Sequence, residues 1–318
     1  MNTVSILMPV KNASPFLKDC LDSILNQTWE RWELIAVDDH SSDSSKEILN
    51  EFAHKDPRIK IFTNQRNGII PALQLALSKA TGTYITRMDA DDLMVPDRLG
   101  KMVTCLDKAN NKTIVTGLVK YFSEEPVSEG YLKYEKWINY LNLSGNQWDQ
   151  VYRECVIASP NWMVHRNTLE EMDCFDQLNY PEDYHLVLKW HQQNMSIITV
   201  PEVTLLWREH TKRTSRTSEN YNQKAFFKLK INHFIENDLK ESQLVLWGNN
   251  EKTRLTIKIL NAAGVGFKQF DITSYQETSN FTQPQILVGV HPDTKERKKI
   301  EAYLSDLSLH EGKDWWYI

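Results

Sequence analysis

The chain of 318 residues has no apolar run near the roughly 20 residues that a membrane-spanning helix requires. Its N-terminal apolar stretch, residues 4–10, is short, is interrupted by Ser5 and Pro9, and follows no basic leader. This pattern predicts a strand and not a signal peptide. The four cysteines include no CxxC pair, which argues against a disulfide framework or a zinc site and fits a reducing compartment. We therefore expect a cytoplasmic protein.

An excess of positive charge is also missing. The formal net charge is -5, which argues against a generally basic surface for nucleic acid or membranes. A hydrophobic content of 41% and a charged content of 25% are ordinary for a soluble globular protein. The length suggests one large domain or two unequal domains.

The first hundred residues alternate between strand and helix patterns. Strands are predicted at residues 4–8, 32–37, 59–62 and 83–88, and helices at 14–26, 44–52 and 70–79. In the first helix, apolar residues recur at the spacing of a helical face. Repeated strand–helix–strand units predict an α/β fold with a doubly wound, mostly parallel sheet.

Three carboxylates follow the predicted strand 83–88, in the stretch Asp89-Ala90-Asp91-Asp92. Carboxylates this close repel one another unless a cation or hydrogen-bond donors offset their charge. Magnesium and manganese accept such oxygen ligands and commonly share them with a substrate phosphate. An acidic turn that caps the next helix is the simpler interpretation.

A second acidic pair, Asp38 and Asp39, follows the predicted strand 32–37. The carboxyl ends of parallel strands meet at one edge of a sheet, where ligands bind. We therefore expect both acidic groups to belong to one site.

The C-terminal part predicts a second, smaller α/β domain. Strands are expected at residues 243–248, 267–270 and 286–290, and helices at 252–263 and 294–304. A polar stretch near residues 238–242 places the boundary between a domain of residues 1–238 and a small Rossmann-like accessory domain of residues 239–318. Only Gly248 remains of a GxGxxG pattern, so we expect packing, acceptor recognition or assembly instead of dinucleotide binding.

Six motifs stand in order over residues 1–235. They are residues 4–12, 37–43, 66–69 and 84–92, Pro181-Glu182-Asp183-Tyr184 and Trp207-Arg208-Glu209-His210. With these motifs the chain resembles family 2 glycosyltransferases of the GT-A fold. The resemblance implies a metal-dependent, inverting enzyme that moves a sugar from a UDP-sugar to a hydroxyl of a glycan acceptor, with Mn²⁺ or Mg²⁺ as cofactor. It also implies surface polysaccharide biosynthesis, with a glycan or lipid-linked glycan acceptor and peripheral association with the inner face of the membrane as an option.

The resemblance also implies roles for individual residues. The donor-binding residues would be Pro9, Val10, Asp38, Asp39, Arg66, Asn67, Gly68, Asp89, Ala90 and Asp91. Asp39 would accept a hydrogen bond from the base, which favours uracil. The metal would be held by Asp91, Asp92 and His210, with the division among the three aspartates left open.

Inversion by a single displacement needs one general base. Asp183 matches the base of the family, while Glu182 would orient the loop or contact a neighbouring sugar. Trp162 is expected to line the acceptor cleft, although most aromatic residues between 131 and 162 are expected to pack in the core. Lys212, Arg213 and Arg216 could hold phosphates or lie in a solvated loop.

Two other functions remain open from the sequence. A sugar nucleotidyltransferase also uses a nucleotide-binding sheet and a metal, but the N-terminal glycine-rich loop of such enzymes is missing. A non-catalytic scaffold that binds nucleotide or glycan is the second alternative, which the intact acidic cluster and Asp183 disfavour.

Overall fold

The computed structural model describes residues 2–175, 178–211, 213, 216, 218–240, 242–271, 273–290 and 294–318. The chain packs into two compact units, and each is assembled from three separate segments. The first unit comprises Met1–Gly145, Ile157–Leu178 and Gln193–Arg213; the second comprises Asn146–Val156, Asn179–Gln192 and Thr214–Ile318. The domain boundary at 238/239 stays a prediction.

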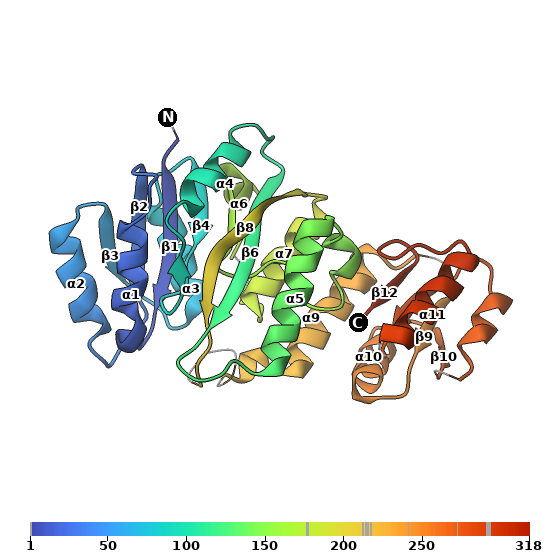
Figure 1. The fold of residues 1–318 in the computed structure, drawn as a ribbon. Helices are drawn as coiled ribbons and strands as arrows, with labels where there is room; N and C mark the ends of the chain where they lie inside the picture. Colours follow the sequence, from blue (N-terminus) through green and yellow to red (C-terminus); the bar gives the residue numbers. More distant parts are fainter. Residues whose placement is uncertain are drawn as a thin grey trace. The chain divides into compact units, whose positions relative to one another are not determined.

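The first unit contains a mixed sheet of eight strands in the order β3-β2-β1-β4-β7-β6-β8-β5 (Figure 1). The strands are β1 (Val4–Val10), β2 (Trp32–Asp38), β3 (Ile59–Thr63), β4 (Tyr84–Arg87), β5 (Leu93–Met94), β6 (Thr113–Phe122), β7 (Trp162–His165) and β8 (Ser196–Arg208). Strands β3, β2, β1 and β4 run parallel, β7 is antiparallel to both neighbours, and β5 is antiparallel to β8. The predicted α/β fold with a mostly parallel sheet is confirmed.

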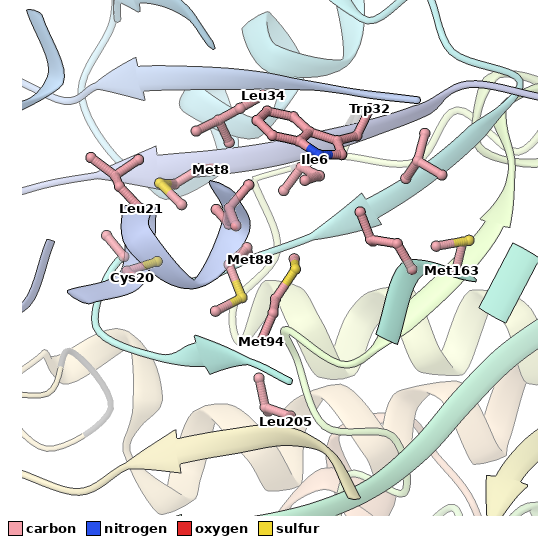
Figure 2. Close-up of a cluster of buried hydrophobic side chains, with 14 of the residues drawn as sticks. Ile6, Met8, Cys20, Leu21, Trp32, Leu34, Met88, Met94, Met163 and Leu205 are labelled. Carbon is pink, nitrogen blue, oxygen red and sulfur yellow. The ribbon is translucent and has the colours of Figure 1, made fainter. Parts of the chain in front are cut away.

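Among the described residues, six helices accompany this sheet. They are α1 (Ser14–Leu25), α2 (Ser45–Lys55), α3 (Ile69–Lys79), α4 (Arg98–Leu106), α5 (Glu129–Ser144) and α6 (Arg166–Glu171). Helix α1 shows why they form: Pro15 occupies its first turn, and Leu17, Leu21 and Ile24 recur on one buried face. Figure 2 shows side chains of α1 beside Met8 of β1 and the methionines that flank the acidic turn, Met88 and Met94. Because Met88 and Met94 belong to this core, the acidic turn is anchored in it at both ends.

Strand β6 pairs with β8 irregularly, because β8 carries extra residues opposite the stretch 117–119. Its register against β8 shifts at Gly117 and Leu118. Asn161 fills the space behind it, donating from Nδ2 to the Gly117 carbonyl over 2.8 Å and accepting at Oδ1 from the Thr204 hydroxyl over 2.8 Å. This side-chain network satisfies backbone groups that a regular ladder would have paired.

The second unit contains a parallel sheet of four strands in the order β10-β9-β11-β12. Its elements are η1 (Trp148–Gln150), α7 (Glu182–Gln192), η2 (Glu219–Tyr221), α9 (Gln223–Asn237), β9 (Leu244–Trp247), α10 (Glu251–Ala262), β10 (Phe267–Phe270), η3 (Tyr275–Asn280), β11 (Gln285–Val288), α11 (Thr294–Asp306) and β12 (Trp315–Tyr317). A small core forms around Trp247, Val288 and Leu304. The predicted second, smaller α/β sheet is therefore present.

Within the described ranges, every helix is too short or too polar to cross a bilayer.

Candidate active site

The carboxyl ends of β1, β2 and β4 form one edge of the first sheet. Val10 lies beside Asp38 in the β1–β2 register, and Leu7 lies beside Arg87 in the β1–β4 register. Because the three strands are parallel, the segments that follow them leave the sheet on the same side. The two acidic groups therefore follow β2 and β4, which pair with β1 on either side, and they leave the sheet at the same end.

Asp39 is held by several donors directly after β2. Its side chain is buried, with the residue 3% exposed, and accepts from Asn64 Nδ2 over 2.6 Å, the Gly68 N–H over 3.0 Å and Lys11 Nζ over 3.2 Å. Gly68 has φ of 105°, a left-handed conformation that favours glycine, and it starts α3. The carboxylate is thus oriented in advance, with Lys11 as its one half-exposed partner.

The predicted donor residues on β1, on β2 and directly before α3 differ in their burial. Asp38 is buried and accepts at Oδ1 from the Ser41 N–H over 3.3 Å, so it supports the turn. Val10 is buried and Pro9 half-buried, whereas Asn67 is exposed. The Arg66 guanidinium is also exposed and donates to the Gln74 side chain. Asn64 was missed by sequence reasoning, because nothing in the pattern distinguishes it from an ordinary turn residue.

The acidic turn places its three carboxylates in different surroundings. Asp89 accepts from Arg87 Nε over 2.7 Å, and Ala90 is buried beside it. Asp91 Oδ2 lies 2.8 Å from His210 Nε2. Asp92 is 1% exposed and accepts at Oδ1 from the Arg208 N–H over 2.7 Å, while its Oδ2 has no partner among the described residues.

These surroundings shift the pKa values of the adjacent residues Asp91 and Asp92 in opposite directions. Burial, and then the charge of Asp91, raises the pKa of Asp92 well above its ordinary value. Burial also acts to raise the pKa of Asp91, but the hydrogen bond with His210 and the charge of Arg213 outweigh it, so that pKa is lowered. Of these two neighbours, Asp91 is therefore the one held in its charged form.

The end of β8 brings Arg208 and His210 to the turn. Arg208 donates from Nε to the Asp91 carbonyl over 2.8 Å and from Nη2 to Asp19 over 3.1 Å. The His210 ring packs against Phe16, with 4.3 Å between ring centroids, and its Nδ1 has no partner in the described part of the chain. Arg208 was not predicted as a site residue, although it lies within a motif.

A second unpredicted residue, Arg98, lies under the turn at the start of α4. It is 0% exposed, and its Nη2 donates to Thr86 Oγ1 over 3.1 Å and to the Pro160 carbonyl over 2.5 Å. Burial lowers the pKa of Arg98 to about 9, against the opposing charges of Asp92 and Asp89. Since an arginine side chain keeps its proton at neutral pH, the turn has a buried cation beneath it.

The residues fit a metal ion that is shared with a substrate. Among the described residues, no three His, Cys, Asp or Glu side chains are grouped to hold a metal alone. Mg²⁺ and related ions are commonly bound by one or two carboxylates together with substrate phosphates and water. Asp91 and the unpartnered oxygen of Asp92 supply such a partial set.

The predicted acceptor residue Trp162 is at β7. Its side chain is buried, with the residue 2% exposed, and its carbonyl accepts from Thr86 Oγ1 over 2.5 Å. Its place in an acceptor cleft stays a prediction. Of the basic loop residues, Lys212 lies outside the described residues, and Arg213 pairs with Glu209 over 3.3 Å.

Asp183 and Glu182 belong to the second unit, where they form the first turn of α7. Asp183 is half-buried and accepts at Oδ1 from the Tyr184 N–H over 2.8 Å. Glu182 is buried and accepts from the Tyr221 hydroxyl. Their assignment to base and acceptor contact stays a prediction.

Comparison with known proteins identifies the family. The family model described as "Glycosyl transferase family 2" matches residues 5–172 of the 318. The chain belongs to glycosyltransferase family 2. It is 28% identical over 235 residues to an uncharacterized glycosyltransferase of Haemophilus influenzae, covering 71% of this chain and 72% of that protein. It is 40% identical over 121 residues to the putative glycosyltransferase EpsE of Bacillus subtilis, covering 37% and 44%.

Solved structures support the fold of this glycosyltransferase. Staphylococcus aureus TarS, residues 1–349 in complex with UDP-GlcNAc, superposes with a TM-score of 0.58 at 17% identity, covering 96% of this chain and 80% of that one. The mannosyltransferase PcManGT of Pyrobaculum calidifontis, in complex with GDP-Man and Mn²⁺, gives a TM-score of 0.56 at 19% identity, covering 83% and 75%. At these identities the likeness shows the shared fold.

Proposed function

We propose that this family 2 glycosyltransferase is a metal-dependent, inverting enzyme that transfers a sugar from a UDP-sugar to a hydroxyl of a glycan acceptor in surface polysaccharide biosynthesis. The observation that carries the proposal is that the acidic turn and Asp39 leave the sheet at the same end, with Asp91 paired to His210. Its TarS neighbour binds UDP-GlcNAc, and its mannosyltransferase neighbour binds GDP-Man with Mn²⁺.

The side chains at the sheet edge divide the work of donor binding. Asp39, fixed by Asn64 and Gly68, would accept from the N–H of the uracil ring. Asp91 and Asp92 would hold a divalent cation, which offsets the negative charge that develops on the leaving diphosphate. His210, held against Phe16, would contact the same cation or the diphosphate.

Transfer then needs one proton acceptor. The Asp183 carboxylate would take the proton of the acceptor hydroxyl as its oxygen attacks the anomeric carbon. The bond from that carbon to the diphosphate oxygen breaks, and the nucleoside diphosphate leaves. Because attack and departure occur on opposite faces, the anomeric configuration inverts.

A calorimetric titration of UDP with and without Mn²⁺ tests the donor site. Wild-type protein should bind UDP tightly when the metal is present. The Asp91→Ala variant should lose at least about tenfold in affinity, as expected for the loss of a charged ligand. Asp22→Ala is the matched control, since Asp22 lies on the exposed face of α1 and pairs with Lys18.

Metal-independent binding, or equal binding by both variants, would contradict the donor site. Release of pyrophosphate from a sugar phosphate and UTP would instead indicate a nucleotidyltransferase. A complete lack of metal-dependent UDP-sugar turnover, with UDP binding intact, would favour a non-catalytic scaffold.

A further inference from the structure

The first turn of α7 buries a carboxylate directly beside the proposed base. Glu182 is 2% exposed, and its Oε2 accepts a hydrogen bond from the Tyr221 hydroxyl. Burying an ionised group is costly unless donors satisfy it. Glu182 therefore has little surface to offer an acceptor sugar, and its hydrogen bond with Tyr221 calls for a different role.

Tyr221 is itself held in a fixed segment. It ends η2, where the Ser218 hydroxyl accepts from the Asn220 N–H over 3.3 Å. The next residue, Asn222, caps α9 by accepting from the Ala225 N–H over 2.9 Å. The Tyr221 ring also meets the Tyr180 ring edge to face, with centroids 6.2 Å apart. Capping on both sides fixes where the hydroxyl lies.

The same turn of α7 is anchored through the residue after Asp183. The Tyr184 hydroxyl donates to the Val151 carbonyl over 2.5 Å, and its ring is fully buried. The Tyr184 N–H in turn donates to Asp183 Oδ1 over 2.8 Å. Asp183 thus stands between two anchored and buried neighbours, Glu182 and Tyr184, and is itself half-buried.

We propose that Tyr221 is a positioning residue of the transfer reaction, which acts through Glu182 to hold Asp183 in the orientation for proton removal. The proposal rests on the assignment of Asp183 as base in the proposed function. Glu182 then orients the catalytic turn and does not contact the acceptor. A displacement of about 1 Å in a reacting group can cost about a hundredfold in rate, so the anchoring of this turn has catalytic weight.

Steady-state kinetics of Tyr221→Phe with a UDP-sugar test the proposal. This variant should lose at least about tenfold in kcat, with the donor KM within about twofold, because the donor residues lie on other elements. Tyr303→Phe is the matched control: it removes a tyrosine hydroxyl of the same unit, which donates to the Gln276 carbonyl over 2.8 Å. The control should keep the wild-type kcat, and equal kcat values for the two variants would overturn the proposal.

A double-mutant cycle with Glu182→Gln separates positioning from general structural damage. Hydrogen bonds to charged acceptors are about twice as strong as neutral ones, so the neutral amide needs the hydroxyl less. In the Glu182→Gln background, Tyr221→Phe should lower kcat by less than about twofold. If the double variant instead shows the product of the two single losses in kcat, the inference is overturned. If Tyr221→Phe alone fails to fold, the comparison of Glu182→Gln with the double variant still tests the expected loss of less than about twofold.

The variant Asp183→Asn distinguishes the inference from the function on which it rests. If Asp183→Asn retains kcat, the assignment of the base fails. If Asp183→Asn is inactive while Tyr221→Phe behaves like its control, the base stands and the positioning role of Tyr221 is wrong.

Discussion

Arg98 is a buried cation that interacts with the charges of Asp92 and Asp89 in the acidic turn. Its guanidinium joins the end of β4, through Thr86, to the segment before β7, through the Pro160 carbonyl. A fully buried cation is unfavourable unless acceptors and opposite charge surround it. Asp92 and Asp89 supply that charge, so the arginine and the turn stabilise each other.

Replacing Arg98 with methionine should therefore destabilise the protein. The change leaves the Pro160 carbonyl without this donor and removes the cation beneath Asp92, at an expected cost of about 2–4 kcal/mol. Urea unfolding measures it. Arg58→Met is the control, since that guanidinium is partly exposed and stacks 3.8 Å from the Trp32 ring, and it should cost about 1 kcal/mol or less. Equal losses would contradict the account.

Single residues also show the limit of what sequence could predict at the site. The acidic stretch and Asp39 could be predicted from the sequence because their residue types and their places after apolar strands are both unusual. Arg98 and Asn64 were not, since their roles depend on which distant groups the fold brings beside them. In a sequence, a buried arginine at the start of a helix cannot be distinguished from an exposed charged residue at the same position.

At the level of elements, strands and helices with a clear period were predicted well. Strand β10, at Phe267–Phe270, matches its predicted range, and α1 begins at Ser14 as expected. The sequence pattern also predicts extended structure over residues 156–165, and of these residues only Trp162–His165 form a strand, β7. The apolar residues before it are buried without a ladder, and periodicity alone does not separate these cases.

Strands β12 and β6 also escaped prediction, for different reasons. Strand β12 has only three residues, Trp315–Tyr317, too few to show alternation. Strand β6 is ten residues long but contains Gly117, which reads as a breaker in sequence. In the fold that glycine is required by Thr204 of β8, because a Cβ at Gly117 would lie 2.6 Å from Thr204 Cγ2.

Gly117→Ala should consequently destabilise the β6–β8 pair. Overpacking of this kind costs about 1–3 kcal/mol, and Thr204→Ala, which removes both the Oγ1 and the Cγ2 atom that the added Cβ would meet, should recover part of it. Equilibrium unfolding in urea gives both values. Gly130→Ala, in helix α5 with a single atom at 4.0 Å from its added Cβ, should be neutral or stabilising. A neutral Gly117→Ala would show that β8 can move away.

For the whole molecule, acid stability is expected to depend on a histidine of the second unit. Burial, with the charges of His191 and His185, lowers the pKa of His233 to about 3. The unfolded chain, with an ordinary value near 6.5, takes up the proton first. Stability is therefore full above about pH 6.5 and falls toward pH 3, by about 1.4 kcal/mol per pH unit for this group.

The variant His233→Gln should flatten that dependence. Its urea midpoint should change less than that of wild type between pH 7 and pH 4.5, because the imidazole with the pKa near 3 is gone. His54→Gln, which alters an exposed histidine of α2, should leave the wild-type slope unchanged. Parallel curves for His233→Gln and wild type would show that other groups govern acid unfolding.

The interleaving of the two compact units bears on how this enzyme can be made and cut. Each unit collects segments from the N-terminal half and the C-terminal half of the chain, so a ribosome must pass Arg208 before the first sheet has its last strand. No single cut yields two intact halves. A product ending at residue 238 would carry the whole first unit but, of the described elements of the second unit, only η1, α7, η2 and α9. Fusion and truncation sites should therefore be chosen from the segments that make up each compact unit and not from a single boundary in the sequence.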